Sequence, residues 1–354
     1  MKNRFLLYLI IFCFGIVDNY SISDEFKIKS EKINVSEGGT LVEATGNVEI
    51  YTDNNLNIKS NKSILNKSKS IIEAVGSVEV IDDINKIIIK SEFINYNKEK
   101  DLIFIKDKSQ TVLDNKITLI SSNLYFDRKY SKIFSEEIGS LIDIDDNKMT
   151  FSRFELDLFK EILKVYNLEF LDSKKNNFFL NEAVIDIRKK EVYGQDAKLY
   201  FDKSIFGNSE NDPRIFGKKL SSNDNETIVN DAEFTSCKIR DNEKCPPWIL
   251  KAKEVKHNKE KKLVEYKNAW LNIYDKPILY FPFFYHPDPT VKRQSGFLMP
   301  KINNSNFLGS SLQIPYYKVI SENKDFTITP RVFFNNSILL QTEYRSVEKY
   351  SKSI

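Results

Sequence analysis

The chain has 354 residues, of which 41% are hydrophobic and 29% are charged, and its formal net charge is +3. This balance suits a folded protein and gives no single-sign field, which argues against nucleic-acid binding. Eleven glycines and ten prolines are too few for a collagen-like or disordered chain, and the length allows about two domains.

Residues 1–22 are predicted to be a secretory signal peptide. Lys2 and Arg4 precede an uncharged apolar run over residues 5–17. That run is shorter than the about 20 residues that span a bilayer. A short membrane anchor is the alternative. Cys13 lies inside the run with no small residues before it, so we do not expect a lipoprotein cysteine.

Residues 23–220 carry a repeat of about thirty residues. The segment ATGNVEI at 44–50 recurs as AVGSVEV at 74–80, and the triplet IKS at 58–60 recurs at 89–91 and, more loosely, at 119–121 and 150–152. A fixed period of this size predicts stacked units made of strands and turns. Gly46 and Gly76 are predicted to mark a turn or a bulge. Residues 154–165 could form a short helix or a further strand.

Alternation within the repeat predicts strands with one buried face. The apolar side of these strands carries Val48, Ile50, Val78 and Val80. Stacked units turn such faces inward. The interior is then either a fully packed core or, if the two walls do not close, an apolar trough open to a ligand.

The repeat resembles the periplasmic OstA-like β-jellyroll domain shared by lipopolysaccharide-transport proteins. The words ATGNVEI and AVGSVEV, with the KS-containing strands after them, carry the resemblance. It implies an all-β domain of stacked strands. It also implies a lipid trough, for which Val48, Ile50, Val78 and Val80 are the candidate lining residues.

Residues 221–294 are predicted to be a junction. Two short strands at 249–252 and 263–266 flank a polar turn in which His257 is expected to be solvated. Cys237 and Cys245 predict a disulfide in an exported protein, with free thiols or pairing beyond this chain as alternatives. Trp248 is expected to pack. With two histidines and no C-x-x-C, a metal site is not favoured.

The stretch from Pro277 to Pro300 is rich in prolines and aromatic residues. Proline lacks an amide donor, so this is neither a helix nor an ordinary core strand. We interpret it as a rigid junction between two β architectures, with a proline-rich linker as the alternative. His286 is expected to make a structural hydrogen bond.

Residues 295–354 are predicted to form antiparallel strands of another kind. Apolar and polar residues alternate in the three strand-like segments around 311–316, 326–332 and 338–345. Outer-membrane barrel strands alternate in this way, and so does a half-buried soluble sheet.

The junction and the first of these strands resemble the LPS-assembly outer-membrane protein family, LptD, also called organic solvent tolerance proteins. The matching words are PPW at 246–248, P-x-x-Y-x-P at 277–282, HPDPTVKRQSGFLMP at 286–300 and IPYY at 314–317. The junction-motif residues are Pro246, Pro247, Trp248, Pro282, His286, Pro287, Asp288, Pro289, Arg293 and Gly296.

This resemblance implies a barrel whose first and last strands meet at a lateral gate. Pro300 and Pro315 match prolines that are implicated in weakening this seam. The sequence ends at Ile354 after about four such strands, which predicts a truncated or split barrel.

We find no catalytic motif, so the sequence predicts a non-enzyme without a cofactor or metal. The resemblance implies lipopolysaccharide transport at the outer membrane, with the N-terminal domain in the periplasm. The implied partners are lipopolysaccharide, an LptA-like bridge protein, an LptE-like lipoprotein and the outer membrane, but no nucleic acid. The alternatives are a soluble bridge component and a porin-like or adhesin-like structural protein.

Overall fold

The computed structural model describes residues 19–22, 26–114, 116–143, 147–172, 175–202, 211–239, 246–288, 291, 293–298, 300–305, 309–335, 337–348 and 351–353. Most of the predicted signal peptide therefore lies outside the described residues. The chain divides into two compact units, residues 1–190 and 191–354. Apart from one 3-10 turn at Glu37–Gly39, the described secondary structure is all strand.

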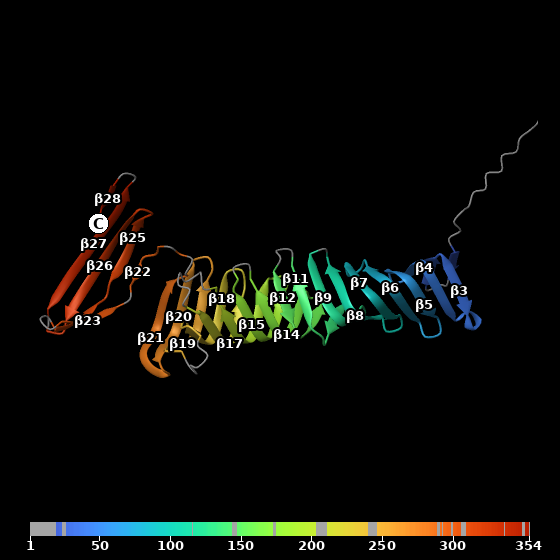
Figure 1. Ribbon diagram of the computed structural model, residues 1–354, viewed down its shortest axis with the longest axis horizontal. Helices are drawn as coiled ribbons and strands as arrows, with labels where there is room; N and C mark the ends of the chain where they lie inside the picture. Colours follow the sequence, from blue (N-terminus) through green and yellow to red (C-terminus); the bar gives the residue numbers. More distant parts are fainter. Residues whose placement is uncertain are drawn as a thin grey trace, which may run out of the picture. The chain divides into compact units, whose positions relative to one another are not determined.

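Unit 1 is an antiparallel array in which strands follow one another in chain order (Figure 1). Its strands are β1 (Asn19–Ile22), β2 (Phe26–Ser30), β3 (Lys32–Ser36), β4 (Leu41–Thr52), β5 (Leu56–Asn66), β6 (Ile71–Asp82), β7 (Ile87–Asn97), β8 (Leu102–Leu113), β9 (Ile117–Asp127), β10 (Lys132–Ser135), β11 (Gly139–Ile142), β12 (Lys148–Phe151), β13 (Arg153–Asp157), β14 (Ile162–Leu171) and β15 (Asn177–Asp186). Residues 154–165, the one candidate helix, are strand in β13 and β14.

Each long strand of unit 1 bends at its middle, so the sheet folds over into two walls joined by a corner. The pairing registers shift at this corner in five successive strand pairs, at Thr45/Val48, Lys59/Lys62, Val75/Val78, Lys90/Phe93 and Ile105/Lys108. Gly46 and Gly76 lie at the corner with φ of 78° and 81°. The left-handed backbone suits glycine, so the predicted role of these glycines in a bulge is confirmed.

A row of serines follows the corner at the period of the repeat. Each hydroxyl donates to a backbone carbonyl beside the bend, over 3.1 to 3.3 Å, in Ser30, Ser60, Ser91, Ser121 and Ser152. A bulge leaves backbone groups without ladder partners, and these hydroxyls satisfy some of them. The recurring KS words of the sequence therefore have a structural cause.

Unit 2 contains two separate antiparallel sheets. The first comprises β16 (Glu191–Tyr200), β17 (Arg214–Ser222), β18 (Glu226–Thr235), β19 (Trp248–Asn258), β20 (Leu263–Ile273) and β21 (Lys276–Pro287), paired in chain order. The pairing of β17 with β18 crosses residue 220 without a break. The predicted domain boundaries at residues 220 and 294 stay a proposal. The second of them falls between Pro287 and Gly296, where the chain passes from one sheet to the other.

The second sheet of unit 2 contains β22 (Gly296–Phe297), β23 (Lys301–Ser305), β24 (Gly309–Gln313), β25 (Tyr316–Ser321), β26 (Lys324–Phe333), β27 (Ile338–Glu348) and β28 (Ser351–Ser353). Strand β26 pairs with β24, β25 and β27. The strands β22 and β23 form one edge, and β28 pairs only with β27 among the described strands.

Candidate functional site

The interior of unit 1 is filled by its own side chains. The four candidate trough residues Val48, Ile50, Val78 and Val80 all point into this interior and are 0% to 2% exposed. Isoleucines from β5, β6, β7 and β8 are as deeply buried. The prediction of an inward apolar face is thus confirmed, and of the two forms left open by the sequence the structure has the packed one.

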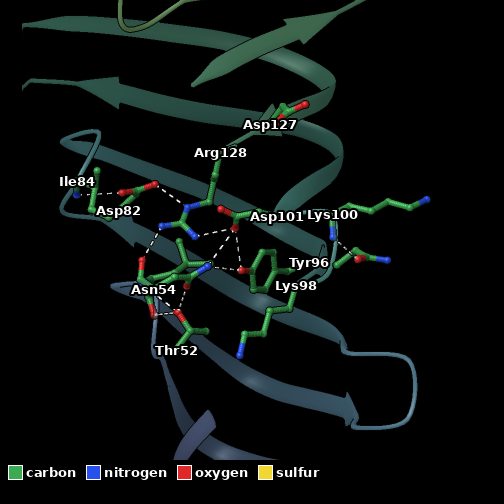
Figure 2. A network of polar contacts seen from close by, with 12 residues as sticks. Thr52, Asn54, Asp82, Ile84, Tyr96, Lys98, Lys100, Asp101, Asp127 and Arg128 are labelled. Carbon is green, nitrogen blue, oxygen red and sulfur yellow. Dashed lines mark hydrogen bonds and ion pairs between the residues drawn. The ribbon is translucent and has the colours of Figure 1, made fainter. Parts of the chain in front are cut away.

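The two walls of unit 1 meet again along a line opposite the corner, where their hairpin turns face one another. The first turn row consists of residues 53–55 and 83–86, and the second turn row of residues 67–70, 98–101 and 128–131. We call the line between these rows the seam. Polar side chains of both rows contact one another there (Figure 2).

Arg128 is the centre of this contact. Its Nε donates to Asp82 over 2.8 Å, one terminal nitrogen donates to Asp101 over 2.8 Å, and the other donates to the Asn54 carbonyl oxygen over 2.8 Å. Arg128 and Asp82 are both buried. Asn54 and Asp82 belong to the side of the first turn row and Asp101 to the second, so the Arg128 guanidinium ties the rows together.

Each partner of Arg128 has further hydrogen bonds. Asp82 also accepts from the backbone N–H groups of Ile84 and Asn85. The Asn54 amide donates to the Tyr96 hydroxyl over 2.8 Å, and that hydroxyl donates to Asp101 over 2.9 Å. Because all these buried polar groups are satisfied, the cluster is a specific structural element.

Burial opposes the positive charge of Arg128, but the hydrogen bond that it donates to Asp82 and the charges of Asp82 and Asp101 outweigh this effect and raise the guanidinium pKa above its usual value. The same cluster acts on Tyr96. Burial, aided by the charge of Asp101, raises the pKa of the Tyr96 hydroxyl to about 12, although the hydrogen bond from Asn54 acts in the other direction.

The raised pKa of Tyr96 predicts a loss of stability in alkali. Between about pH 10 and pH 12 the unfolded tyrosine has released its proton while the folded one retains it. The free energy of unfolding therefore falls as the pH rises through this window, by up to about 1.4 kcal/mol per pH unit, and Tyr96 adds no slope below it. We expect Tyr96→Phe to remove that part of the slope. Urea titrations followed by circular dichroism from pH 9 to 12 measure it, and equal slopes for both proteins contradict it.

A groove of about 640 Å³ lies on unit 1 near the corner. Its lining includes Lys59, Lys90 and Lys108 together with Glu79 and Glu92. Glu79 lies 3.5 Å from the Lys59 ammonium and 3.6 Å from that of Lys90. Since its lysines are partly neutralised in this way, the groove shows no built anion site.

The PPW segment closes one end of the first sheet of unit 2. Thr235 donates to the Trp248 carbonyl oxygen over 2.8 Å, and the Trp248 ring packs edge-on against Phe234. The Pro247 carbonyl oxygen accepts from the backbone of Tyr274, and Pro246 precedes it. The prediction that Trp248 packs is confirmed. Cys237 is half-buried and Cys245 lies outside the described residues, so their disulfide stays a prediction.

The HPDP segment is anchored on the two preceding strands. The Tyr266 ring stacks on Phe284 with centroids 4.4 Å apart, and its hydroxyl lies 3.1 Å from His286 Nε2. Asp288 Oδ2 lies 2.7 Å from His257 Nε2. The structural hydrogen bond predicted for His286 is present. The prediction that His257 is a solvated turn residue is wrong, because His257 lies in β19 and its imidazole meets Asp288.

The prolines of β21 occupy positions where the ladder needs no donor. Pro277 and Pro287 lie near the two strand ends, opposite Asn272 and Leu263. Pro282 falls between two registered pairs, at the bend marked by the positive φ of Asn268. The sequence predicted no ordinary core strand here, and β21 is a largely exposed strand that pairs only with β20 among the described strands. Pro289 lies outside the described residues.

The second sheet of unit 2 has one apolar and one polar face. Cross-strand registers place Ile302, Leu312, Val332 and Ile338 in one row, and Tyr316 and Ile328 in another row of the same face. The opposite face is mainly polar. It carries Gln313, Thr327, Thr329, Arg331 and Gln341, together with Phe333 and Leu339. The predicted alternation is confirmed. Several apolar-face side chains are exposed, among them Ile302, Ile338 and Leu340.

Three prolines interrupt this sheet at one level. Pro300 separates β22 from β23, and Pro315 separates β24 from β25. Pro330, which the sequence did not single out, lies in the neighbouring β26, where its carbonyl oxygen accepts from the Ile314 N–H over 3.2 Å. The Pro315 carbonyl oxygen accepts from the Leu298 N–H. The sheet therefore lacks amide donors at adjacent points of three strands.

Arg293 of the junction motif is attached to the polar face of this sheet. It contacts Asp325, and its Nε donates to the Tyr317 hydroxyl over 3.1 Å. Arg345 Nε donates to the other oxygen of Asp325 over 2.7 Å. Gly296 follows in β22. This cluster holds the junction against the strands that follow it.

Among the described residues, no helix is long and apolar enough to cross a membrane. No group of three or more histidine, cysteine, aspartate or glutamate residues within the described ranges could hold a metal ion.

Comparisons with known proteins give a relationship over the C-terminal part of the chain. A family described as LptD protein matches residues 265–353. The LPS-assembly protein LptD of Pseudoalteromonas translucida is 36% identical over 128 residues, 36% of this chain and 16% of that protein. That of Acinetobacter baylyi is 38% identical over 120 residues, 34% of this chain and 14% of that protein. The matched segments thus span a small part of these relatives.

A solved structure of LptH from Pseudomonas aeruginosa, described as the LptA-homologous periplasmic component of a lipopolysaccharide transport device, was also found. It is 10% identical, and the match covers 40% of this chain and 81% of LptH. The TM-score is 0.19.

Proposed function

We infer, from the relationship of residues 265–353 to the LptD family, that this chain takes part in lipopolysaccharide transport and assembly at the outer membrane. The observation that carries this inference is the second sheet of unit 2. It lies within the matched segment and presents one apolar and one polar face, as strands at a lipid surface do.

In this proposal the second sheet of unit 2 begins a membrane barrel. Its apolar face meets lipid, and its polar face lies toward the lumen. Pro300 and Pro315 are the candidates for a lateral gate, and the donor-poor line through Pro330 supports them. Barrel strands that must part at a gate should have few ladder hydrogen bonds to break.

The unit 1 interior is the proposed path for the acyl chains of lipid A. Each methylene buried there gains about 0.8 kcal/mol relative to water, which favours passage through an apolar space. Because the interior is packed, a chain enters only where the walls separate. An LptA-like bridge would dock on an open strand edge of the array. An LptE-like lipoprotein would bind the barrel, and the strand array of unit 1 would lie in the periplasm.

Site-specific photo-crosslinking in cells tests this function. A photoreactive residue at Val48, Ile50, Val78 or Val80 should capture lipopolysaccharide, and one at the outward-facing Glu49 should not. Capture only from Glu49 would contradict an internal path. The matched pair Ile50 and Glu49 lies on one strand, so differences in expression affect both alike.

A packed stalk of a porin-like or adhesin-like protein is the second candidate. The full burial of the unit 1 interior favours it. It predicts no lipid capture from any of the four inward positions.

A further inference from the structure

The seam is held differently from the rest of unit 1. Within each wall, neighbouring strands share ladder hydrogen bonds. Backbone hydrogen bonds between the described turns stay within one row: in the second row, the Lys98 N–H donates to Ser70 and the Arg128 N–H donates to Asp101. Contacts from one row to the other are made by side chains. The seam is therefore closed by side-chain contacts and not by ladder hydrogen bonds.

The corner cannot open in the same way. The strands β4 to β9 run continuously through it, and the serine row ties its backbone. Any separation of the walls must hinge at the corner and widen at the seam. The side chains exposed first are then those between the corner and the turn rows, including Ile50 and Val80, which are apolar.

Two ionic contacts cross the seam at neighbouring levels. Lys98 lies 3.1 Å from Asp53, and Arg128 lies 2.8 Å from Asp82. Both basic residues open a turn of the second row, and the corresponding position of the next turn is Leu158. Of these two contacts, the one between Arg128 and Asp82 is fully buried.

We propose that the Arg128 cluster, formed by Arg128, Asp82, Asp101, Asn54 and Tyr96, is a clasp that closes the apolar interior of unit 1 at the seam, and that an acyl chain is admitted between the turn rows when the clasp opens. The closing role depends on this geometry alone. The admission of an acyl chain rests on the proposed function.

Hydrogen–deuterium exchange of the full chain in detergent micelles tests the clasp. In Arg128→Met the strand ends beside the turns lose their link across the seam and open their ladder bonds more often. We therefore expect amide exchange at least tenfold faster in the seam-side halves of β4 to β9, with the corner halves unchanged. Arg153→Met is the matched control, since Arg153 is half-exposed and stacks on Tyr166 at 3.8 Å, away from the seam. Its exchange should equal that of the unmodified protein. Unchanged exchange in Arg128→Met, or an equal rise in both halves, overturns the clasp.

A second variant covers the case in which Arg128→Met does not fold. Arg128→Lys keeps the charge but offers one ammonium group to three acceptors, and we expect the same seam-side pattern at a smaller amplitude. A uniform rise in this variant also overturns the proposal.

Lipid capture separates the clasp from the proposed function. With a photoreactive residue at Val80 and added lipopolysaccharide, Arg128→Met should increase crosslinking several-fold over Arg153→Met. Equal capture by both variants overturns the admission step while the transport function stands. If amide exchange rises only on the seam side and none of the variants captures lipopolysaccharide, the clasp is supported as a closure and the transport function is contradicted.

Discussion

Arg128→Met should lower the free energy of unfolding of unit 1 by about 3 to 5 kcal/mol, the usual cost of removing one partner from a buried ion pair. The change leaves Asp82 buried without its cation, and it removes the donor to the Asn54 carbonyl oxygen. The methionine side chain fills much of the space, so loss of packing contributes little. The expected loss is therefore electrostatic in origin.

Two readouts locate this effect. Pulse proteolysis in urea, with detection of fragments from residues 1–190, reports unit 1. Both tryptophans, Trp248 and Trp270, lie in unit 2, so their fluorescence reports the other unit. We expect the unit 1 midpoint to fall and the fluorescence midpoint to stay. Arg153→Met should change unit 1 by no more than about 1 kcal/mol, as for an exposed pair. Equal losses in the two variants would show that the cluster has no special role.

The architecture of unit 1 could be predicted from the sequence because its causes are local and repeated. Alternation fixes which side chains point inward, and Gly46 and Gly76 mark the bend. The serine period was visible, but its cause was not. It depends on carbonyl groups that only the bend leaves unpaired.

The clasp could not be predicted because its members lie in or beside polar turns that are far apart in the chain. Asp82 and Arg128 are 46 residues apart, and each has neighbours typical of a solvated loop. Because the sheet folds over, the two turn rows come together and these two residues form a buried pair. One signal was available: Lys67, Lys98 and Arg128 recur at the repeat period.

The motifs identify the junction, but they do not show which contacts its residues make. The lysine and asparagine neighbours of His257 predict a solvated side chain, whereas Asp288, 31 residues further along the chain, contacts its imidazole. Pro330 gave no signal of its own. Its significance follows from the strand register, which places it beside the breaks at Pro315 and Pro300.

Leu340→Arg should weaken membrane association strongly if the second sheet of unit 2 meets lipid as proposed. Leu340 lies on the apolar face, paired with Pro330, and is 61% exposed. An arginine on a lipid-facing strand costs about 2 to 4 kcal/mol near the middle of the bilayer. The partition of the full chain into lipid vesicles should then fall roughly 30- to 700-fold, since about 1.4 kcal/mol is tenfold.

Gln341→Arg is the matched control because it places the same residue one step along β27, on the polar face opposite Thr329. The two variants carry the same added charge, so any general effect of charge on vesicle binding is shared. Flotation of the full chain with vesicles measures both. If the apolar face is instead the exposed side of a soluble sheet, both arginines are solvated and both variants behave alike. A loss confined to Leu340→Arg requires a hydrocarbon environment on that face alone, which a stalk protein without a membrane sheet does not provide.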